Sequence, residues 1–570
     1  MIGTYAAVAT ICVSSLSIGQ AAIHLCGARR WSWLAPAVGL ALVCALCWGA
    51  VRLPGEGVLS AVALLVVTLM ALAYLVGRLE GAGEALSVGW PVAVAALLAA
   101  SLPFLVEGHF GILGTSFNPD MSQHLLAADR LAEGHPSQLL NQGYPLGPHS
   151  IVVALNKGFG VGLVQGFSGL TVAVAVLACL TALAAFSQLP LLPRSAGALL
   201  VGLPYVVASY FAQGAFKETM QALFLLAFVL ALRESTRTWA DLPLRFVPAA
   251  LIAVGSVYTY SFPGLIWLGG AAGLWAIFTR PAAKALGLAL LAFLVLIAPE
   301  IRRMVDFHSF ETFDPNGPGL GNLFGQLSPF EALGIWPSGD FRLAPGDGAV
   351  PAPLYYLGIA FALVLLAYGV VQLWRRREVA ILSGLAAAAL AYAAARLGGT
   401  PYTAAKAIEI GAPLVALTIL LPLLGEACRL SYPGGNKVDM QRFALPVTAA
   451  LFVAAAGVCS LLALANAPVG PTSYSASLSD YRKVVGEGPT LVIASPQLLE
   501  EEHGEPFLAW EMRGGRVCIE STAEPKVPPG VRFLVLEAGD RWALKRVRPR
   551  PGKPPCPLVA ERQARQGPAR

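Results

Sequence analysis

The run GVLSAVALLVVTLMALAYLVG, residues 57–77, decides the class of fold. An α-helix needs about 20 apolar residues to cross the hydrocarbon core of a bilayer, and this run reaches that length without a charged side chain. Runs of the same kind recur along the chain as far as Pro468. The chain of 570 residues is 56% hydrophobic and 13% charged, with a mean hydropathy of +0.66. We therefore expect an all-α polytopic membrane protein.

Hydropathy along the chain predicts about fourteen transmembrane helices. They cover residues 3–25, 33–51, 57–77, 90–106, 162–188, 196–212, 219–232, 246–260, 263–279, 285–300, 353–373, 379–395, 408–425 and 443–465. Re-entrant helices are the alternative for the pair divided by YTYSFPG, residues 258–264, and for the short span that begins near Thr219. The first run lacks a charged leader, so we expect a retained helix rather than a signal peptide.

The positions of Lys and Arg predict which side of the membrane each loop faces, because cytoplasmic loops retain these residues. Under the fourteen-span order, the basic loops all fall on one side, which we expect to be the cytoplasm of a plasma-membrane protein. The other, extracytoplasmic side then receives four polar regions: residues 107–149, 302–352, 398–407 and the chain after Pro468. The net charge of +6 comes from the basic loops and a basic C-terminus. No nucleic-acid-binding motif accompanies it.

Three regions follow from this layout. We expect N-terminal transmembrane helices at 1–89, a larger transmembrane domain at 90–468 and an extracytoplasmic soluble tail at 469–570. Within the tail, TLVIAS (490–495) and VRFLVLE (531–537) are typical of short buried strands, which predicts a small α/β domain.

The tail holds two cysteines, Cys518 and Cys556. Thiols in an oxidising compartment tend to pair, so we predict a disulfide between them. The tail could cap the membrane domain, hold a polar polymer, or act as a spacer.

The first polar loop carries the densest group of ionisable residues. In SFNPDMSQHLLAADRLAEG, residues 116–134, the leucines predict a helix that lies on the membrane surface. Asp120 and His124 would face the same way, one turn apart. A carboxylate and an imidazole so placed can take a proton from a hydroxyl group or hold a divalent metal. The alternative is that Asp120 caps the helix and His124 points to water.

The layout of the chain resembles that of the polytopic GT-C glycosyltransferases. The acidic first loop is followed by YPLGPH (144–149), many spans, a second polar loop and a soluble tail. LGNLFGQLSPFEALGIWPSGDFRL (320–343) and PYTAAKAIEIGAPL (401–414) are similar to loops of uncharacterised actinobacterial membrane proteins of that superfamily.

This resemblance implies transfer of a sugar from a polyprenyl-phosphate donor to a hydroxyl group of an envelope glycan or lipid, with an Asp of the first large loop as base. Asp120 occupies that place. Unlike many members, this chain has Met121 rather than a second acid after Asp120, and four predicted spans precede the loop. No cofactor is required, and a divalent metal remains open.

A leaving phosphate in a poorly solvated site needs cations nearby. The candidates are Lys406, Arg302, Arg303, Lys217 and Arg130. Lys406 enters a span, which is costly unless its ammonium group meets an anion or snorkels to the interface. Arg302 and Arg303 could equally anchor the protein at lipid headgroups.

Further candidates would hold the acceptor, the sugar or a metal. Glu218 and Asp340 join His124 as acceptor or metal ligands. Trp336, Arg342 and Tyr402 are candidates for sugar binding, because apolar sugar faces stack on aromatic rings while hydroxyl groups need polar partners. The alternatives are a simple interfacial pairing for Lys217 and Glu218, and a structured loop for 336–342.

Two other classes of function stay open. Many spans and a helix broken near Pro263 also suit a lipid or sugar transporter or flippase. A non-catalytic scaffold of envelope assembly is the third possibility.

Overall fold

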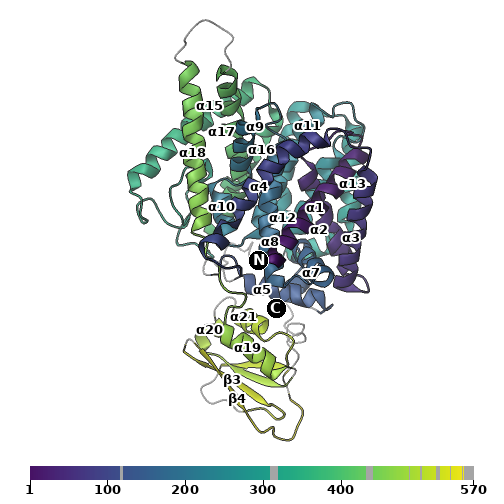
Figure 1. Cartoon of the computed structure of the whole chain (residues 1–570), viewed down its shortest axis with the longest axis vertical. Coiled ribbons are helices and arrows are strands. Elements are labelled where there is room, and N and C mark those ends of the chain that lie inside the picture. Colours follow the sequence, from purple (N-terminus) through teal and green to yellow (C-terminus); the bar gives the residue numbers. More distant parts are fainter. Residues whose placement is uncertain are drawn as a thin grey trace.

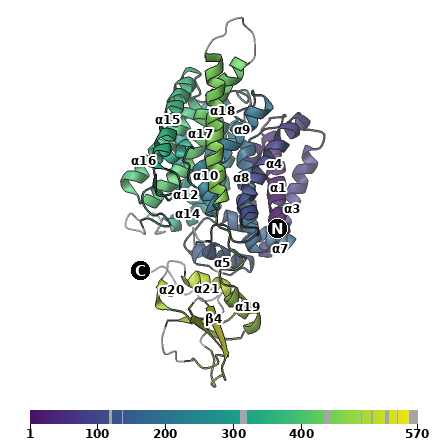
Figure 2. The ribbon, with the colours of Figure 1, turned by 60° about the vertical axis from the view of Figure 1, so that its left-hand side comes forward.

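The chain forms a helical bundle with a small sheet-containing domain at one end (Figure 1). The computed structural model describes residues 1–115, 120–135, 137–308, 319–431, 441–486, 488–500, 504–521, 527–539, 541–554 and 556. We call residues 476–547 the tail domain, and the end of the bundle that faces it the tail side. The N-terminus also lies on the tail side (Figures 1 and 2).

The helices of the bundle follow one another with short connections. The first half contains α1 (Ile2–Leu25), α2 (Ala35–Val51), α3 (Glu56–Leu75), α4 (Ala82–Val106), α5 (Met121–Ala132), α6 (Gln138–Asn141), α7 (Gly147–Phe159), α8 (Leu163–Ala182), α9 (Leu191–Gly202), α10 (Tyr205–Ala212) and α11 (Phe216–Thr236). The second half contains α12 (Val247–Thr279), α13 (Ala283–Ile297), η1 (Ala298–Glu300), α14 (Ile301–Phe307), η3 (Pro329–Leu333), α15 (Ala352–Arg375), α16 (Val379–Gly398), α17 (Pro401–Ser431) and α18 (Gln441–Ala465).

The described residues contain ten helices that are long and apolar enough to cross a membrane, or up to eleven if the pair α9 and α10, bent by 53°, counts as one span. A polytopic helical protein is therefore confirmed, whereas the predicted number of fourteen spans is not. Part of the difference lies in α2, which is shorter than the others. Part lies in α12, a single helix by its hydrogen bonds that covers two predicted spans.

The chain of α12 reverses direction at Ser261, whose φ of 58° and ψ of −156° are not helical. Gln221 of α11 bridges the two halves, since its side chain accepts from Ser256 Oγ at 2.7 Å and donates to Gly264 O at 3.0 Å. Eight residues of straight helix would separate these partners by about 12 Å. The break therefore forms a tight hairpin between the two predicted spans.

Burial separates central from peripheral helices. In both α8 and α17, 94% of the most apolar window is buried, against 17% for the segment Ala283–Phe307. Close packing of α1 on α2 depends on two glycines, because a Cβ on Gly39 would collide with Ser15 O and one on Gly19 with Ala35 O. Small residues allow such backbone approach where no hydrophobic effect drives helices together in lipid.

The first polar loop folds back under the bundle. Its helix α5 lies between the bundle and the tail domain (Figure 2), packed against α7 and α21. Leu125 and Leu126 are buried, and so are His124 and Arg130. His124 therefore does not point to water. Asp120 occupies the N-cap position of α5, but its side chain makes no capping hydrogen bond to the helix.

The tail domain is a small α/β structure, as predicted. It comprises α19 (Ala476–Val485), β1 (Thr490–Ile493), α20 (Pro496–Glu500), α21 (Gly504–Glu511), β2 (Val517–Glu520), β3 (Phe533–Ala538) and β4 (Arg541–Arg546). The strand order is β2-β1-β3-β4. Strand β1 is parallel to β2 and β3, with Thr490 opposite Val517 and Phe533, and β4 is antiparallel to β3.

A disulfide joins Cys518 of β2 to Cys556, with their Cα atoms 4.7 Å apart. Cys556 packs into a small apolar core with Leu491 and Val531. The bond thus attaches the chain beyond β4 to the opposite edge strand of the sheet.

Candidate functional site

A buried ion pair lies where α11 and α17 begin. Lys406 Nζ is 3.0 Å from Glu218 Oε1, and the two side chains are 13% and 6% exposed. The ammonium group also lies 4.2 Å from the centre of the Tyr402 ring. Removing two charges from water is costly, and a pair this deep is retained for specificity or function more readily than for stability.

The residues just before α11 and α17 determine where these two helices begin, next to the ion pair. Gly214 adopts a φ of 73°, and the turn it makes starts α11 at Phe216. Thr400 receives a hydrogen bond from Thr403 N at 3.2 Å and precedes Pro401, a residue suited to the first turn of a helix. Lys217 and Glu218 thus stand in the first turn of α11, and Lys406 in the second turn of α17. The positive ends of two helix dipoles meet there and favour an anion.

Lys217 adds a second ammonium group. Its Nζ lies 4.1 Å from the centre of the Tyr144 ring, and it is within electrostatic range of Glu218, Lys406 and Asp120. The Asp120 charge acts on Tyr402 as well. The structure therefore brings together five sequence-predicted residues: Asp120, Lys217, Glu218, Lys406 and Tyr402. We call this group, together with Glu409, the ion cluster.

Glu409 was missed by sequence reasoning. It is fully buried, and within the described part of the chain neither carboxylate oxygen has a hydrogen-bond partner. It follows Lys406 by one turn of α17 and interacts with the charges of Lys406 and Glu218. The signal was present in the sequence, because an acid inside an apolar span marks a candidate functional residue.

Two further tyrosines come from other elements. Tyr210 lies near the end of α10 and Tyr260 at the break of α12, and both interact with Lys406 and Glu409. Sequence reasoning could not bring these elements together, because nothing in the spans indicates which helices are neighbours.

His124 lies behind the ion cluster rather than in it. Its Nδ1 is 3.1 Å from Nε2 of His149, and its ring contacts Tyr144 and Phe216. Burial lowers the pKa of His149 to about 3, so this imidazole is neutral at physiological pH. The described residues contain no group of three or more His, Cys, Asp or Glu side chains placed to hold a metal ion.

The structure places other predicted residues outside the ion cluster. Arg303 donates to Leu140 O and Tyr144 O at 3.0 and 2.6 Å and pairs with Glu300, while its neighbour Arg302 is exposed. Arg130, near the C-terminal end of α5, is buried beside Asp129.

The second loop also stands apart. Asp340 and Arg342 pair with each other, with Nη2 to Oδ2 at 2.7 Å. Trp336 is 1% exposed, and its ring packs against Tyr355 at 5.0 Å. A sugar ring therefore has no access to the Trp336 face in this conformation.

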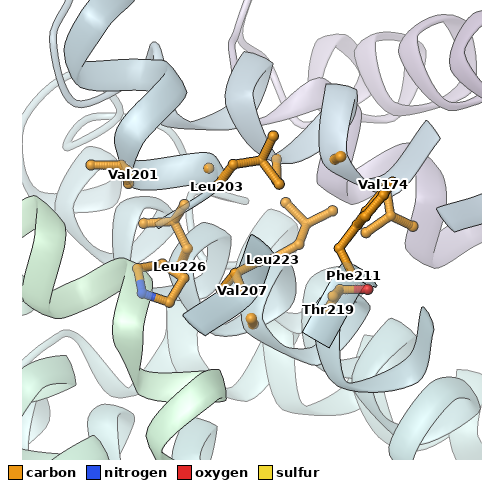
Figure 3. Close-up of a pocket in the computed structure, with 13 residues that line it drawn as sticks. Val174, Val201, Leu203, Val207, Phe211, Thr219, Leu223 and Leu226 are labelled. Carbon is orange, nitrogen blue, oxygen red and sulfur yellow. The ribbon is translucent and has the colours of Figure 1, made fainter. Parts of the chain in front are cut away.

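A small apolar cavity, with room for about one water molecule, lies beyond the ion pair, between α8, α11, α17 and the break of α9 and α10. Figure 3 shows its lining, which includes Phe211, Leu223 and Thr219. Thr219 follows Glu218, and Pro413, also in the lining, lies one turn beyond Glu409. Charged and apolar surfaces are thus adjacent at this site.

The chain resembles a known protein in its structure but matches none in its sequence. No family model matches the chain, and no curated protein matches its sequence. Among solved structures, the chain is similar to the single-particle cryo-EM structure of the arabinofuranosyltransferase AftD from mycobacteria, with a TM-score of 0.47 and 14% sequence identity. The match covers 79% of this chain and 35% of that one, so this chain spans about a third of its length.

Proposed function

We propose that this protein is a membrane glycosyltransferase of GT-C type. It moves a sugar from a polyprenyl-phosphate-sugar donor to a hydroxyl group of an envelope glycan or lipid acceptor at the extracytoplasmic face. The observation that carries the proposal is the ion cluster, in which Lys406 pairs with Glu218 at 3.0 Å and Lys217 is within electrostatic range of both Glu218 and Asp120.

The two lysines suit the phosphate of the donor. Both stand near helix N-termini, so the fixed dipoles and the ammonium charges act on an anion in the same direction. In a site with little water, such preorganised charges stabilise a leaving phosphate more strongly than they would in solution. The side chains beyond Thr219 are mostly apolar, and apolar surroundings suit the hydrocarbon chain of such a donor.

Asp120 serves as the base. Its carboxylate takes the proton of the acceptor hydroxyl, the oxygen attacks the anomeric carbon, and the bond from that carbon to the phosphate oxygen breaks with inversion. The phosphate leaves with its electron pair, stabilised by Lys406 and Lys217. Glu218 holds Lys406 in place at 3.0 Å before the donor arrives. In this mechanism Tyr402, beside Lys406, contacts the sugar.

The tail side is the extracytoplasmic side in this proposal. Arg233 pairs with Glu378 at 3.0 Å, and Arg376 pairs with Glu426 at 2.5 Å, so basic loops gather where α11, α15 and α17 end. The ion cluster lies at the opposite ends of α11 and α17. Because basic loops remain cytoplasmic, this distribution supports an extracytoplasmic tail domain and ion cluster.

Two observations favour a second candidate, a lipid or sugar transporter. Glu409 is buried inside α17, and acids in spans also mark proton or substrate pathways. The hairpin of α12 beside Tyr260 is the kind of break that transporters use at binding sites.

Sugar transfer by the purified protein in lipid nanodiscs tests the proposal. The donors are labelled polyprenyl-phosphate sugars, the acceptors are envelope glycans, and wild type is compared with Asp120→Asn, Lys406→Gln and the exposed control Arg302→Gln. Transfer that collapses in the first two variants but not in the control supports the proposal. Flux of a labelled lipid or sugar across vesicles, without transfer from any donor, would favour the transporter.

A further inference from the structure

The tail domain and the first loop are joined through the backbone. Ile112 N donates to Gly470 O at 3.1 Å, Gly470 N returns a bond to Ile112 O at 2.8 Å, and Gly114 N donates to Pro468 O at 2.7 Å. The side chain of Thr115 accepts from Gly470 N at 3.1 Å. The segment that leads into the tail domain is therefore paired with the segment that leads into α5.

Tyr474 continues this connection toward Asp120. Its backbone N–H donates to Glu511 Oε1 of α21 at 2.7 Å, which ties the linker to the tail domain. Its ring packs edge-on against Phe507 at 5.7 Å. The phenol group lies within electrostatic range of the Asp120 carboxylate and close to the backbone of Ser122. A side chain held by the tail domain thus lies close to the start of α5 and within electrostatic range of the residue proposed as base.

A second contact holds the other end of α5. Arg513 Nε lies 3.9 Å from Asp129 Oδ1. The guanidinium group is itself fixed, since it stacks 3.5 Å from the centre of the Trp510 ring and donates to Trp510 O at 2.8 Å. Helix α21 packs along α5 between these two contacts. The linker, through Tyr474, and the tail domain, through Arg513, therefore contact α5 near its two ends.

We propose that the tail domain acts as a clamp on α5 and sets the position of the Asp120 carboxylate, with Tyr474 as a positioning residue and Asp129–Arg513 as the second contact. The role rests on the proposed function of Asp120, although the clamp itself is a physical contact that can be measured without the reaction. Figures 1 and 2 show the domain seated directly against α5.

The clamp has a distinct kinetic signature. A base displaced by about 1 Å can cost on the order of a hundredfold in rate, whereas the lysines that hold the donor lie in α11 and α17 and stay in place. Tyr474→Ala should therefore lower kcat at least about tenfold and leave the KM for the donor within about twofold. Tyr474→Phe keeps the ring and its contact with Phe507, so it should retain most of the rate.

Hydrogen exchange of the full-length protein in nanodiscs tests the clamp without substrate. Arg513→Glu should accelerate exchange in α5, and the charge swap Asp129→Arg with Arg513→Glu should restore protection. Arg541→Glu, on the exposed face of edge strand β4, is the matched control. Unchanged exchange in Arg513→Glu and Tyr474→Ala would overturn the clamp.

Kinetics of the same variants then test the coupling to Asp120. Faster exchange in α5 combined with an unchanged kcat would overturn the positioning role and leave a merely structural contact. If the wild type transfers no sugar from any donor, the proposed function fails, while the exchange data still decide the clamp.

Discussion

Lys406 and Glu218 meet at 3.0 Å in a site from which water is nearly excluded. Lys406 comes from α17 and Glu218 from α11. A second lysine, Lys217, and a second glutamate, Glu409, interact electrostatically with this pair. The pair holds equal and opposite charge at the point where an anion would bind. In the proposed mechanism a donor phosphate competes with Glu218 for Lys406, which would link ligand binding to a change in this pair.

Replacing one partner of this pair should be worse than replacing both. Lys406→Met leaves the Glu218 carboxylate buried without its counter-ion, and breaking a buried pair in this way costs about 3–5 kcal/mol. The double variant Lys406→Met with Glu218→Leu removes both charges and should recover most of that loss. Denaturation of the purified protein measures the stability, and sugar transfer should stay lost in both variants. Equal destabilisation in single and double variants would contradict this account.

Glu409→Gln should lower the activity of the protein without lowering its stability. Its carboxylate has no hydrogen-bond partner among the described residues, so the neutral amide, which has nearly the same shape, removes no hydrogen bond there. We expect thermal stability equal to or above that of the wild type, together with at least a tenfold loss of transfer or transport. Glu426→Gln, at the other end of α17, is the control for a carboxylate with partners. A fully active Glu409→Gln protein would remove Glu409 from the site.

Glu511 predicts a pH dependence of the tail domain. Burial raises the pKa of this carboxyl group above its ordinary value of 4.5, against the opposing effect of hydrogen bonds from Tyr474 and Ser475. Folding then favours the protonated form, so the stability contributed is complete below the unfolded pKa and is lost as pH rises through the raised folded pKa. Glu511→Gln keeps an oxygen acceptor without the charge. The protection of α21 against hydrogen exchange, corrected for the intrinsic rise of the exchange rate with pH, should fall from pH 4 upward in the wild type and change less in the variant.

Two glycines of α2 offer a test of helix packing. A Cβ on Gly39 would collide with Ser15 O of α1, whereas one on Gly49 has no atom within 4 Å. Gly39→Ala should therefore separate α1 from α2 and destabilise the bundle by about 1–3 kcal/mol. Gly49→Ala should be neutral or slightly stabilising, since alanine favours helix by about 1 kcal/mol. Thermal unfolding of both variants in the same detergent decides between these outcomes.

The sequence by itself determined that the chain is a bundle of apolar helices with a small α/β tail. Hydropathy depends on local composition, so the apolar runs at 57–77 and, in the tail, at 490–495 were sufficient. The sequence also indicated four candidate functional residues: Asp120, Lys217, Glu218 and Lys406. Burying an ionisable side chain beside or inside an apolar run costs free energy, so such a residue is a candidate for function. The sequence placed these four residues in three separate elements and did not indicate which elements are neighbours in space.

Only the tertiary structure decided which candidates meet. It brought Lys406 to Glu218 and Asp120 to Lys217, paired Asp340 with Arg342, covered Trp336 with Tyr355, and engaged Arg303 with backbone carbonyls. It also showed that α12 turns back at Ser261 and that the tail domain packs on α5. The physical reason is that contacts between helices depend on the shape of whole helix faces and on close approach at residues such as Gly39. The composition of a single span does not determine these properties.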